Sequence, residues 1–550
     1  MSSPASSPPT VRTLVDEFLA EQQATTAVER FAAWHDDTHP RTEAYRDLLP
    51  ATPPGPGQQY AFEVDLDACS GCKACVVACG SLNGLPDGAS FRRTGTLVGT
   101  RDELPVVRTV TSACHHCAEP GCLTGCPADA YEKDPVTGVV RHLDDQCIGC
   151  QYCTLTCPYE VPAFDADRGI VRKCDLCHER LAVGEAPACV QACPTEAIAI
   201  RTVALDDVHA AADTPWPLPS PDPATTVPST RYRTSEALRD GVVATDAGAP
   251  ALAHAHPPLT VMLVLTQVAV GTSLAVAALP GIADVEVVRA TTLPATIVVL
   301  LTAVVALAAS VLHLGRPWQA WRAVLGLRHS WLSREIVAFG AFAGLTTAAT
   351  LTAADVPTGA AALAGPTAFA ASSAGLVGVG TSVMVYAVCG RRWWSAPRTG
   401  ARFAATTALG GLAVLLALVT VVGAVTGVPV AELAIRVAVA STVVAVAVVA
   451  AEVALLLRAR GPADDEVAAT ARVLVRHLPG VVVTRLAGSV VGAVLAPWLA
   501  VGALTIPRTS PTAAAVVALL GLGAVVVGEL ADRWRFFTAV APVRMPGGAR

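Results

Sequence analysis

The stretch that decides the fold runs Cys147-Ile-Gly-Cys-Gln-Tyr-Cys-Thr-Leu-Thr-Cys157-Pro158. Its first three cysteines are two residues apart, so a short loop can direct three thiolates at three corners of one cubane iron–sulfur cluster. The fourth cysteine follows after three residues, precedes a proline and begins a helix that points toward a neighbouring cluster. This is the arrangement of two-cluster ferredoxins, in which the last cysteine binds the other cluster.

Three similar groups surround this stretch, and together the four groups hold sixteen of the 17 cysteines. Zinc would use isolated tetrads without the trailing cysteine. Disulfides are not expected either, because the uncharged N-terminus lacks an export signal and the cysteines should stay in the reducing cytoplasm. The groups are Cys69, Cys72, Cys75 and Cys79; Cys114, Cys117, Cys122 and Cys126; Cys147, Cys150, Cys153 and Cys157; and Cys174, Cys177, Cys189 and Cys193.

The composition changes sharply along the 550 residues. Residues 1–257 carry a formal net charge of −15. Residues 258–550 carry a net charge of +9 and consist of long Ala/Val/Leu/Gly stretches. The first half of the chain, which carries the cysteine groups and is called the head below, has no Lys/Arg-rich stripe beside aromatic residues. Nucleic-acid binding is therefore not expected. Eight apolar segments have the length that spans a bilayer as helix, and a soluble helical domain built from them would have little polar surface. The segments are 259–280, 293–312, 335–354, 367–389, 404–427, 433–457, 484–505 and 512–531.

These patterns divide the chain into four parts. Residues 1–57 form a partly disordered extension with one helix near 11–19 and a second near Thr26 and Glu29, expected to pack on the head rather than to dock a partner. Residues 58–200 are the iron–sulfur domain. Residues 201–257 are Pro/Ala-rich and are predicted to be an extended connector that buries no core. Residues 258–550 are the membrane anchor.

The arginines of the anchor predict its orientation. Seventeen of its 20 arginines fall on the side shared by both termini, and only Arg289, Arg436 and Arg508 fall on the other. Because cytoplasmic loops carry the excess of basic residues, we expect the head and both termini in the cytoplasm.

The cysteine spacings and two flanking stretches resemble one family. The four-residue spacing in group two, the eleven-residue gap in group four, Asp144–Cys153 and Gly169–Cys174 are similar to the four-cluster subunit of DMSO reductase-family molybdoenzymes. The resemblance implies four 4Fe–4S clusters, with the Cys69 cluster facing a catalytic subunit and the Cys147 cluster nearest the membrane. It also implies this pairing: Cys69, Cys72 and Cys75 with Cys193; Cys174, Cys177 and Cys189 with Cys79; Cys114, Cys117 and Cys122 with Cys157; Cys147, Cys150 and Cys153 with Cys126.

The membrane half resembles the eight-helix, haem-free anchor subunit of the same enzymes, through His313–Arg322, Arg328–Glu335 and Gly528–Phe537. The resemblance associates His313 and Glu335 with menaquinol oxidation. Quinol oxidation releases two protons, which a neutral His or a carboxylate can accept.

The other polar residues of the anchor are expected to be structural. Haem is not expected, because the anchor offers only His313, His329 and His477, all at one edge, and the last two are predicted to be loop residues. Ion pairing or snorkelling is expected of Glu452, Arg485, Glu529 and Arg533.

The predicted fold class is an α+β double bacterial-ferredoxin-like head followed by an all-α eight-helix transmembrane bundle. The predicted function is a redox subunit of an oxidoreductase. It oxidises menaquinol from the quinone pool and passes electrons to a separate molybdopterin catalytic subunit, for which these 550 residues have no room. Two alternatives stay open: electron flow from a dehydrogenase to quinone, and a membrane-bound relay without a quinone site.

Overall fold

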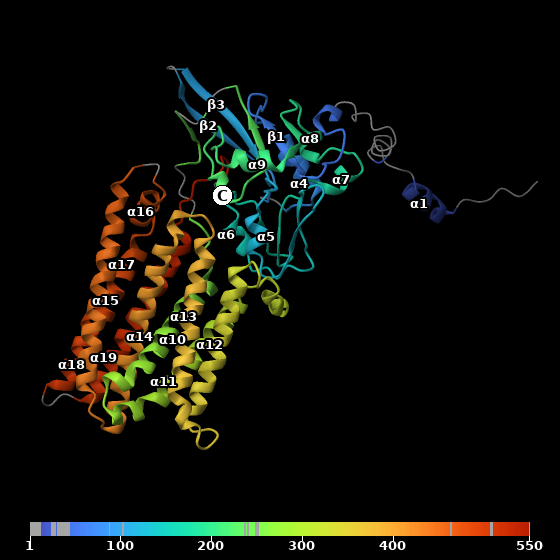
Figure 1. The fold of residues 1–550 in the computed structure, drawn as a ribbon. Coiled ribbons are helices and arrows are strands. Elements are labelled where there is room, and N and C mark those ends of the chain that lie inside the picture. Colours follow the sequence, from blue (N-terminus) through green and yellow to red (C-terminus); the bar gives the residue numbers. More distant parts are fainter. Residues whose placement is uncertain are drawn as a thin grey trace, which may run out of the picture.

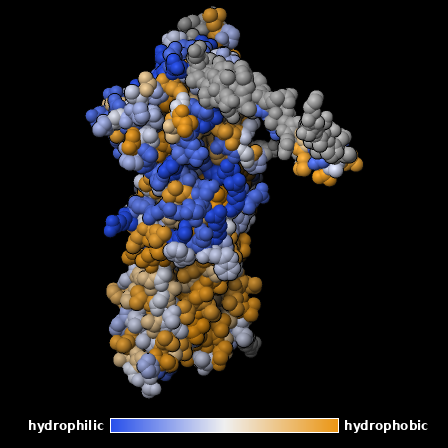
Figure 2. All heavy atoms as spheres, turned by 90° about the vertical axis from the view of Figure 1, so that its right-hand side faces the viewer, coloured by the Kyte–Doolittle hydropathy of each residue, from blue (hydrophilic) through white to orange (hydrophobic). Residues whose placement is uncertain are grey.

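The computed structural model describes residues 13–23, 29, 45–86, 89–101, 104–235, 238, 241–247, 252–462, 465–506 and 510–548. A head of strands and short helices stands on a bundle of long helices, and the C-terminus returns to the junction between them (Figure 1). Figure 2 shows the corresponding surface, hydrophilic around the head and hydrophobic over the bundle.

The N-terminal helix α1 (Leu14–Gln23) does not pack on the head. Leu14 and Phe18 are 73% and 65% exposed, and Figure 1 shows α1 well away from the other elements. The expectation of packing on the head is therefore wrong for this helix, because its apolar face meets no core. The predicted second helix and the predicted disorder of residues 1–10 fall outside the described residues.

Among its described residues, the head contains two three-stranded sheets and two short hairpins. The first sheet has the order β8-β1-β9, with β1 (Gln58–Asp65) antiparallel to β8 (Ile198–Ala204) and parallel to β9 (Arg231–Arg233). The second has the order β10-β2-β3 and is antiparallel. Its strands and those of the hairpins are β10 (Val242–Ala244), β2 (Arg93–Arg101), β3 (Leu104–Ser112), β4 (Tyr131–Lys133), β5 (Val140–His142), β6 (Ala163–Asp165) and β7 (Ile170–Arg172).

Short helices follow the cysteine loops and pack in two pairs. The helix of the first group, α4, packs on α8 of the fourth group, and α5 of the second group packs on α6 of the third. The sequence order is therefore nested in space, as two-cluster ferredoxin folding requires. The helices are α4 (Ala74–Leu82), α5 (Gly121–Gly125), α6 (Tyr152–Thr156), α7 (His178–Ala182), α8 (Ala188–Gln191) and α9 (Leu205–Ala212).

The segment 201–257 is not the extended connector that its composition predicts. It completes β8 and contributes β9 and β10 to the two sheets of the head. Leu218 and Tyr232 are buried in the main core of the head. Prolines prevent this segment from forming long helices, but they do not prevent it from covering a core with strands and turns. The prediction that it buries no core is therefore wrong.

The eight predicted spans are confirmed among the described residues of the anchor. Each is a helix longer than the apolar segment that identified it. The seventh span is continuous although its middle is wound as a π-helix, η7 (Gly488–Leu495). The spans are α10 (Pro257–Ile282), α11 (Val285–Val311), α12 (Trp331–Ala353), η4 with α13 (Ala360–Leu363 and Ala364–Ala387), α14 (Ala396–Thr426), α15 (Ala431–Leu457), α17 with η7 and α18 (Pro479–Ala487 and Ala496–Thr505) and α19 (Pro511–Thr538).

Helices α10 and α14 lie at the centre of the bundle, where glycines permit close packing. A side chain at Gly271 of α10 would overlap the carbonyl of Thr407 on α14. Between the spans lies a further helix, α16 (Glu466–His477), so the loop prediction for His477 is wrong. His329 does lie in the turn before α12, where its Nε2 is 2.8 Å from Oδ1 of Asp129 in the head.

Candidate iron–sulfur sites and their junction with the anchor

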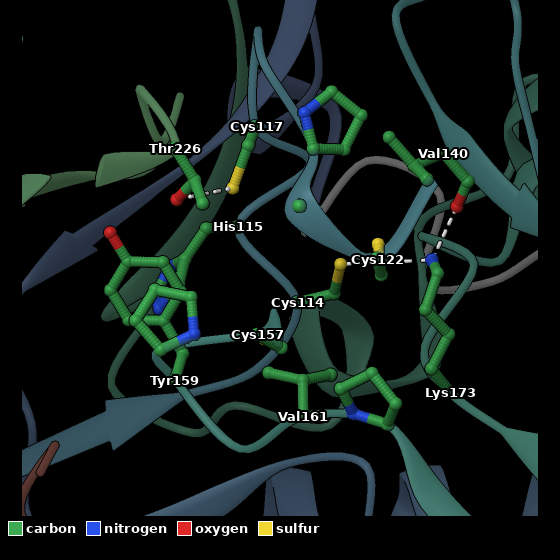
Figure 3. Close-up of a pocket in the computed structure, with 14 residues that line it drawn as sticks. Cys114, His115, Cys117, Cys122, Val140, Cys157, Tyr159, Val161, Lys173 and Thr226 are labelled. Atoms are coloured by element: carbon green, nitrogen blue, oxygen red, sulfur yellow. Dashed lines mark hydrogen bonds between the residues drawn. The ribbon is translucent and has the colours of Figure 1, made fainter. Parts of the chain in front are cut away.

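Four cysteines from two groups line one cavity of the head (Figure 3). Cys114, Cys117 and Cys122 come from the second group and Cys157 is the last cysteine of the third. Lys173 lies at the edge of the cavity with its Nζ 3.7 Å from Sγ of Cys114, where its positive charge balances thiolate.

A second cavity brings together Cys174, Cys177 and Cys189 with Cys79, the last cysteine of the first group. Arg92 lines this cavity, is buried, and stacks on the ring of Phe62. Asn83 donates a hydrogen bond of 3.7 Å to Sγ of Cys79. A buried cation and an amide donor are the groups that a negatively charged sulfur site needs.

The remaining cysteines form two more sets. Cys193 is close enough to Cys69 and Cys75 for their thiolate charges to repel one another, and Cys72 shares this set. Cys126 stands in the same relation to Cys147, Cys150 and Cys153. The structure therefore brings the last cysteine of each group near the group with which the family resemblance pairs it. The role of the sixteen cysteines as ligands is a proposal taken up below.

The chemistry of these sets fits iron–sulfur clusters. Burial raises the pKa of Cys79 to about 12 and that of Cys177 to about 11, and neighbouring thiols add to both shifts. A thiol in such a place becomes a thiolate only beside compensating positive charge, which iron supplies. Within the described ranges, no three His, Cys, Asp or Glu side chains converge on a single-ion site.

Exposure differs among the four sets. Cys72 is exposed and Cys69 and Cys193 are half-buried, so this set lies near the surface of the head. The set of Cys147, Cys150, Cys153 and Cys126 is buried or half-buried and lies at the opposite side, against the anchor. The four sets therefore extend from the surface of the head to the membrane bundle.

The loop between α11 and α12 binds the head through backbone contacts. Gly315 approaches Gly149 and Gly169 so closely that a side chain at any of the three would overlap the opposing backbone. Arg316 and Arg322 donate to the carbonyls of Asp144 and Asp145 at 2.7 and 2.9 Å. These contacts fix the loop that carries Cys147 and Cys150 onto the anchor.

The same loop also contacts the second cysteine group. The amide of Gly326 donates to the carbonyl of Pro127 at 2.8 Å, and the hydroxyl of Ser330 donates to the carbonyl of Gly125 at 2.7 Å. One loop of the anchor thus holds both cysteine loops that contribute to the membrane-facing set.

His313 begins this junction and lies directly beside a cysteine loop. Its imidazole lies close to the backbone of Cys150. Burial lowers the pKa of His313 to about 4, against the opposing effect of the Cys150 backbone. The imidazole is therefore neutral at pH 7, and its buried Nε2 has no hydrogen-bond partner among the described residues.

His256 lies beside His313 and was missed by the sequence analysis. The two rings meet edge to face with centroids 5.1 Å apart, and His254 contacts His256 at 4.6 Å. Burial lowers the pKa of His256 to about 3, and the two neighbouring histidines add to this effect. The boundary drawn at residue 257 removed both residues from the histidines counted for the anchor, so the absence of haem stays a prediction.

Glu335 lies on α12, near the end of the same cysteine loop. It is 3% exposed and accepts a hydrogen bond from the hydroxyl of Ser382 on α13. Tyr152, two residues after Cys150, lies within electrostatic reach of Glu335 and donates to the carbonyl of Val385 at 2.6 Å. His313 lies near Cys150 and Glu335 lies near Tyr152. No hydrogen bond joins His313 to Glu335 in the part of the chain that the structure describes.

The four charged residues of the anchor for which ion pairing or snorkelling was expected all form ion pairs. Arg485 pairs with Glu529, and the end of α19 adds a second pair between Arg535 and Glu452. Asp532 joins the network through Arg533 and Arg535, both at 2.5 Å. Asp532 and Arg535 were visible in the sequence as a charged run within an apolar segment, but their partners come from α15 and α17 and could not be assigned.

A ferredoxin-like head with four cysteine sets, fixed on an eight-helix membrane bundle, defines a membrane-bound iron–sulfur electron-transfer protein. Comparison with known families agrees. Residues 106–203 match the 4Fe-4S dicluster domain, and residues 253–539 match the DMSO reductase anchor subunit (DmsC). The second match covers more than half of the chain, which therefore belongs to the DMSO reductase anchor subunit family and carries its iron–sulfur domain in the same polypeptide.

Individual relatives are similar to this chain over 148 to 163 residues. The B subunit of the anaerobic dimethyl sulfoxide reductase of Haemophilus influenzae is 36% identical over 150 residues, which are 26% of this chain and 73% of the relative. The probable anaerobic dimethyl sulfoxide reductase chain YnfG of Escherichia coli K12 is 36% identical over 148 residues, 26% of this chain and 72% of the relative. The formate dehydrogenase-O iron-sulfur subunit of Escherichia coli K12 is 36% identical over 163 residues, 26% of this chain and 54% of the relative.

Proposed function

We propose that this chain oxidises menaquinol in its anchor and passes the electrons through four 4Fe–4S clusters to a separate molybdopterin-containing catalytic subunit. The observation that carries the proposal is the close packing of the loop after His313 on the loop of Cys150, in which the amide of Gly315 donates to the carbonyl of Gly149 at 3.3 Å. It places a candidate proton acceptor of the membrane site directly against a cysteine loop of the head. Quinol oxidation needs both an electron acceptor and a proton acceptor within short reach of the same ring.

Sixteen cysteines would hold the clusters, which when bound supply sites for one-electron transfer. Lys173, Arg92 and Asn83 would balance the charge of the sulfur atoms next to them or donate hydrogen bonds to them. The proposed ligand sets are Cys69, Cys72, Cys75 and Cys193; Cys79, Cys174, Cys177 and Cys189; Cys114, Cys117, Cys122 and Cys157; and Cys126, Cys147, Cys150 and Cys153.

The residues around Cys150 divide the work of quinol oxidation. Menaquinol loses two electrons and two protons on becoming menaquinone. The neutral His313 has a free Nε2 that can accept a hydrogen bond from one quinol hydroxyl. Glu335 has a hydroxyl rather than a cation as its partner, and it can therefore take up a proton without breaking an ion pair. His256 holds the ring of His313 in place through its edge-to-face contact.

The proposed orientation places the head and both termini in the cytoplasm. The excess of arginines on the head side of the bundle supports it. Arg316 and Arg322 belong to this excess and also bind the head. With His313 and Glu335 at the same end, quinol protons would leave on the cytoplasmic side, and this step would not build a proton gradient.

The relatives also support a catalytic partner, because they are chains or subunits of reductase and dehydrogenase complexes. The formate dehydrogenase relative favours a second candidate function, in which electrons flow from a dehydrogenase partner to quinone. The same residues would then deliver protons to the quinone. Cluster midpoint potentials relative to the quinone pool distinguish the two directions.

The decisive experiment measures cluster reduction by a menaquinol analogue in the purified full chain, followed by visible absorbance and electron paramagnetic resonance. We expect His313→Ala and Glu335→Gln each to slow reduction about 100-fold or more, the usual effect of losing a proton acceptor. His329→Ala, a histidine of the same loop that binds the head instead, serves as the control. Unchanged reduction rates in both variants would favour a relay without a quinone site.

Metal analysis tests the rest of the proposal. A tagged complex solubilised gently from its native membrane should contain about 16 iron atoms per chain, from four four-iron clusters, and about one molybdenum atom with a co-purifying large subunit. The same iron content without molybdenum would remove the molybdopterin partner from the proposal and leave the iron–sulfur chain intact.

A further inference from the structure

A groove lies between α14 and α15, away from the cysteine loops and from Glu335. Its volume is about 580 Å³, within the range of about 300–1,000 Å³ that is typical of ligand pockets. The lining residues come from η5 (Arg392–Trp394), α14, α15, η6 (Arg458–Arg460), α16 and α17, and none comes from α10–α13. The groove is therefore separate from the proposed quinol site.

The part of the groove that is farther from the head is apolar and open to the membrane. Ala404 and Ala408 line it from α14, and Val444, Ala447 and Ala451 line it from α15. Ala404, Ala447 and Ala451 are exposed on the outer surface of the bundle, where lipid covers the helices. Small side chains on two neighbouring helices leave an apolar furrow between them.

The part of the groove that is nearer the head is positively charged. Arg398, Arg402, Arg458 and Arg485 line it, against a single carboxylate, Glu452. Arg398 stands near the start of α14 and Arg458 directly follows α15, so these two guanidinium groups lie at the head-side end of the bundle, at the level of the lipid headgroups. The groove thus has a cationic end at the membrane surface and an apolar end within the membrane.

The charges of this end are incompletely satisfied within the protein. Glu452 is already bound by both terminal nitrogens of Arg535. Arg402 stacks on the ring of Trp393 at 4.0 Å, and its buried Nη1 has no hydrogen-bond partner among the described residues. Arg485 is 3% exposed and pairs with Glu529, and its Nε lies 3.9 Å from Oδ1 of Asp532 without a hydrogen bond, so Arg402 carries the clearest unsatisfied donor. Buried donors of this kind normally have an acceptor.

We propose that this groove binds one anionic phospholipid, with its phosphate between Arg398 and Arg402 and one acyl chain along the alanine-lined furrow. A phosphate oxygen would supply the acceptor that Nη1 of Arg402 lacks, since guanidinium groups bind phosphate with strong charge-assisted hydrogen bonds. A quinol headgroup is neutral and would leave unbalanced the charges of Arg398 and Arg402, which form no ion pair among the described residues, whereas Arg458 and Arg485 pair with Asp465 and Glu529. A free anion would make no use of the apolar furrow. Basic pockets between membrane helices are a usual place for anionic lipid headgroups.

The test uses the purified full chain with its lipids counted by native mass spectrometry and lipid extraction. After delipidation, phosphatidylglycerol, phosphatidylcholine or inorganic phosphate is added and the thermal unfolding midpoint is measured. We expect about one tightly held phosphatidylglycerol per chain and a rise of the midpoint with phosphatidylglycerol alone, because only this lipid combines the charge with the acyl chain.

Two variants separate lipid binding from folding. Arg402→Gln removes the unsatisfied guanidinium, and Ala404→Leu fills the furrow while keeping every charge. Each should reduce the retained phosphatidylglycerol about fivefold or more, as expected when one bidentate contact or the furrow itself is lost. Arg436→Gln is the matched control, because Arg436 lies at the other end of α15 on the exposed surface with Glu432 as its partner. It should change neither the retained lipid nor the response to phosphatidylglycerol.

Three results would overturn the proposal. Equal retention of phosphatidylcholine would show that charge does not select the occupant. Stabilisation by inorganic phosphate alone would reduce the site to an anion site. Full retention of phosphatidylglycerol in Ala404→Leu would show that the lipid binds elsewhere.

Discussion

Buried carboxyl groups have different partners in the first half of the anchor (α10–α13) and in the second half (α14–α19). In the second half, Glu452, Glu529 and Asp532 each bind at least one arginine. In the first half, Glu335 is equally buried but has the hydroxyl of Ser382 as its hydrogen-bond partner. These four are the buried carboxyl groups of the described residues.

This difference separates structural charge from chemical charge. A carboxylate paired with arginine is held in its ionised form, because protonation would leave the cation buried without compensation. A carboxyl that faces only a hydroxyl can be protonated at little loss, since the hydroxyl can both donate and accept. The half that contacts the cysteine loops is therefore the half able to exchange protons, and the other half holds helices together.

Breaking the ion network should have the largest effect. Asp532→Asn removes the charge that faces Arg533 and Arg535, both buried. Removing one partner of a buried ion pair leaves an uncompensated charge, and we expect a loss of about 3–5 kcal/mol in the free energy of unfolding. Unfolding in mixed detergent micelles, followed by circular dichroism, measures this loss.

The matched control for this prediction is Glu432→Gln. It makes the same chemical change in an ion pair with Arg436 at the exposed end of α15, where such pairs contribute about 0–1 kcal/mol. Equal losses in the two variants would contradict the view that the inner network stabilises the second half.

The sequence predicted some of this organisation and not the rest, for physical reasons. Cysteine spacing is a local property, so the four cysteine groups follow from patterns such as that of Cys147–Cys157. The pairing of distant groups into four sets is not local, and the family resemblance alone implied it. The spans follow from length and hydropathy, which are also local. The partners of Asp532 and Arg535 include residues far along the chain, such as Glu452 on α15, and only packing brings them together.

The errors have the same origin. Prolines in residues 201–257 indicate the lack of long helices, but tertiary contacts decide that Leu218 is buried. His256 immediately precedes the first span, so a boundary drawn from hydropathy separated it from the site it joins. Both cases depend on contacts between distant residues, which composition does not report.

The junction of the first half with the head should break at one glycine. In Gly315→Ala the new methyl group would overlap the backbone of Gly169, which has no flexible side chain to move aside. Overpacking of this kind costs about 1–3 kcal/mol, and the head should separate from the anchor more readily. Limited proteolysis of the junction, together with quinol-driven cluster reduction, measures the change. Gly340→Ala on α12 meets open space and should leave both properties intact.

A single hydrogen bond across the same junction gives a smaller effect. Tyr152→Phe removes the donor to the carbonyl of Val385 while keeping the buried ring. The loss in unfolding free energy should be about 1 kcal/mol, the usual net value of one hydrogen bond. Ser330→Ala, which removes a comparable bond to Gly125, should behave alike. A loss above that of Gly315→Ala would mean that Tyr152 does more than anchor the loop.

The smallest effect on stability is expected at Glu335, where the proposed function is most sensitive. Glu335→Gln keeps a carbonyl oxygen that can accept the bond from Ser382, and it leaves no arginine unpaired. We therefore expect the free energy of unfolding to change by less than about 1 kcal/mol, since the hydrogen bond is retained. The measurement is the same micelle unfolding used for Asp532→Asn.

A loss as large as that of Asp532→Asn would mean that Glu335 is fixed by charge like the carboxylates of the second half. A stable variant that no longer accepts electrons from quinol would instead assign the carboxyl to proton transfer, because loss of a proton acceptor slows the reaction without unfolding the helix that carries it.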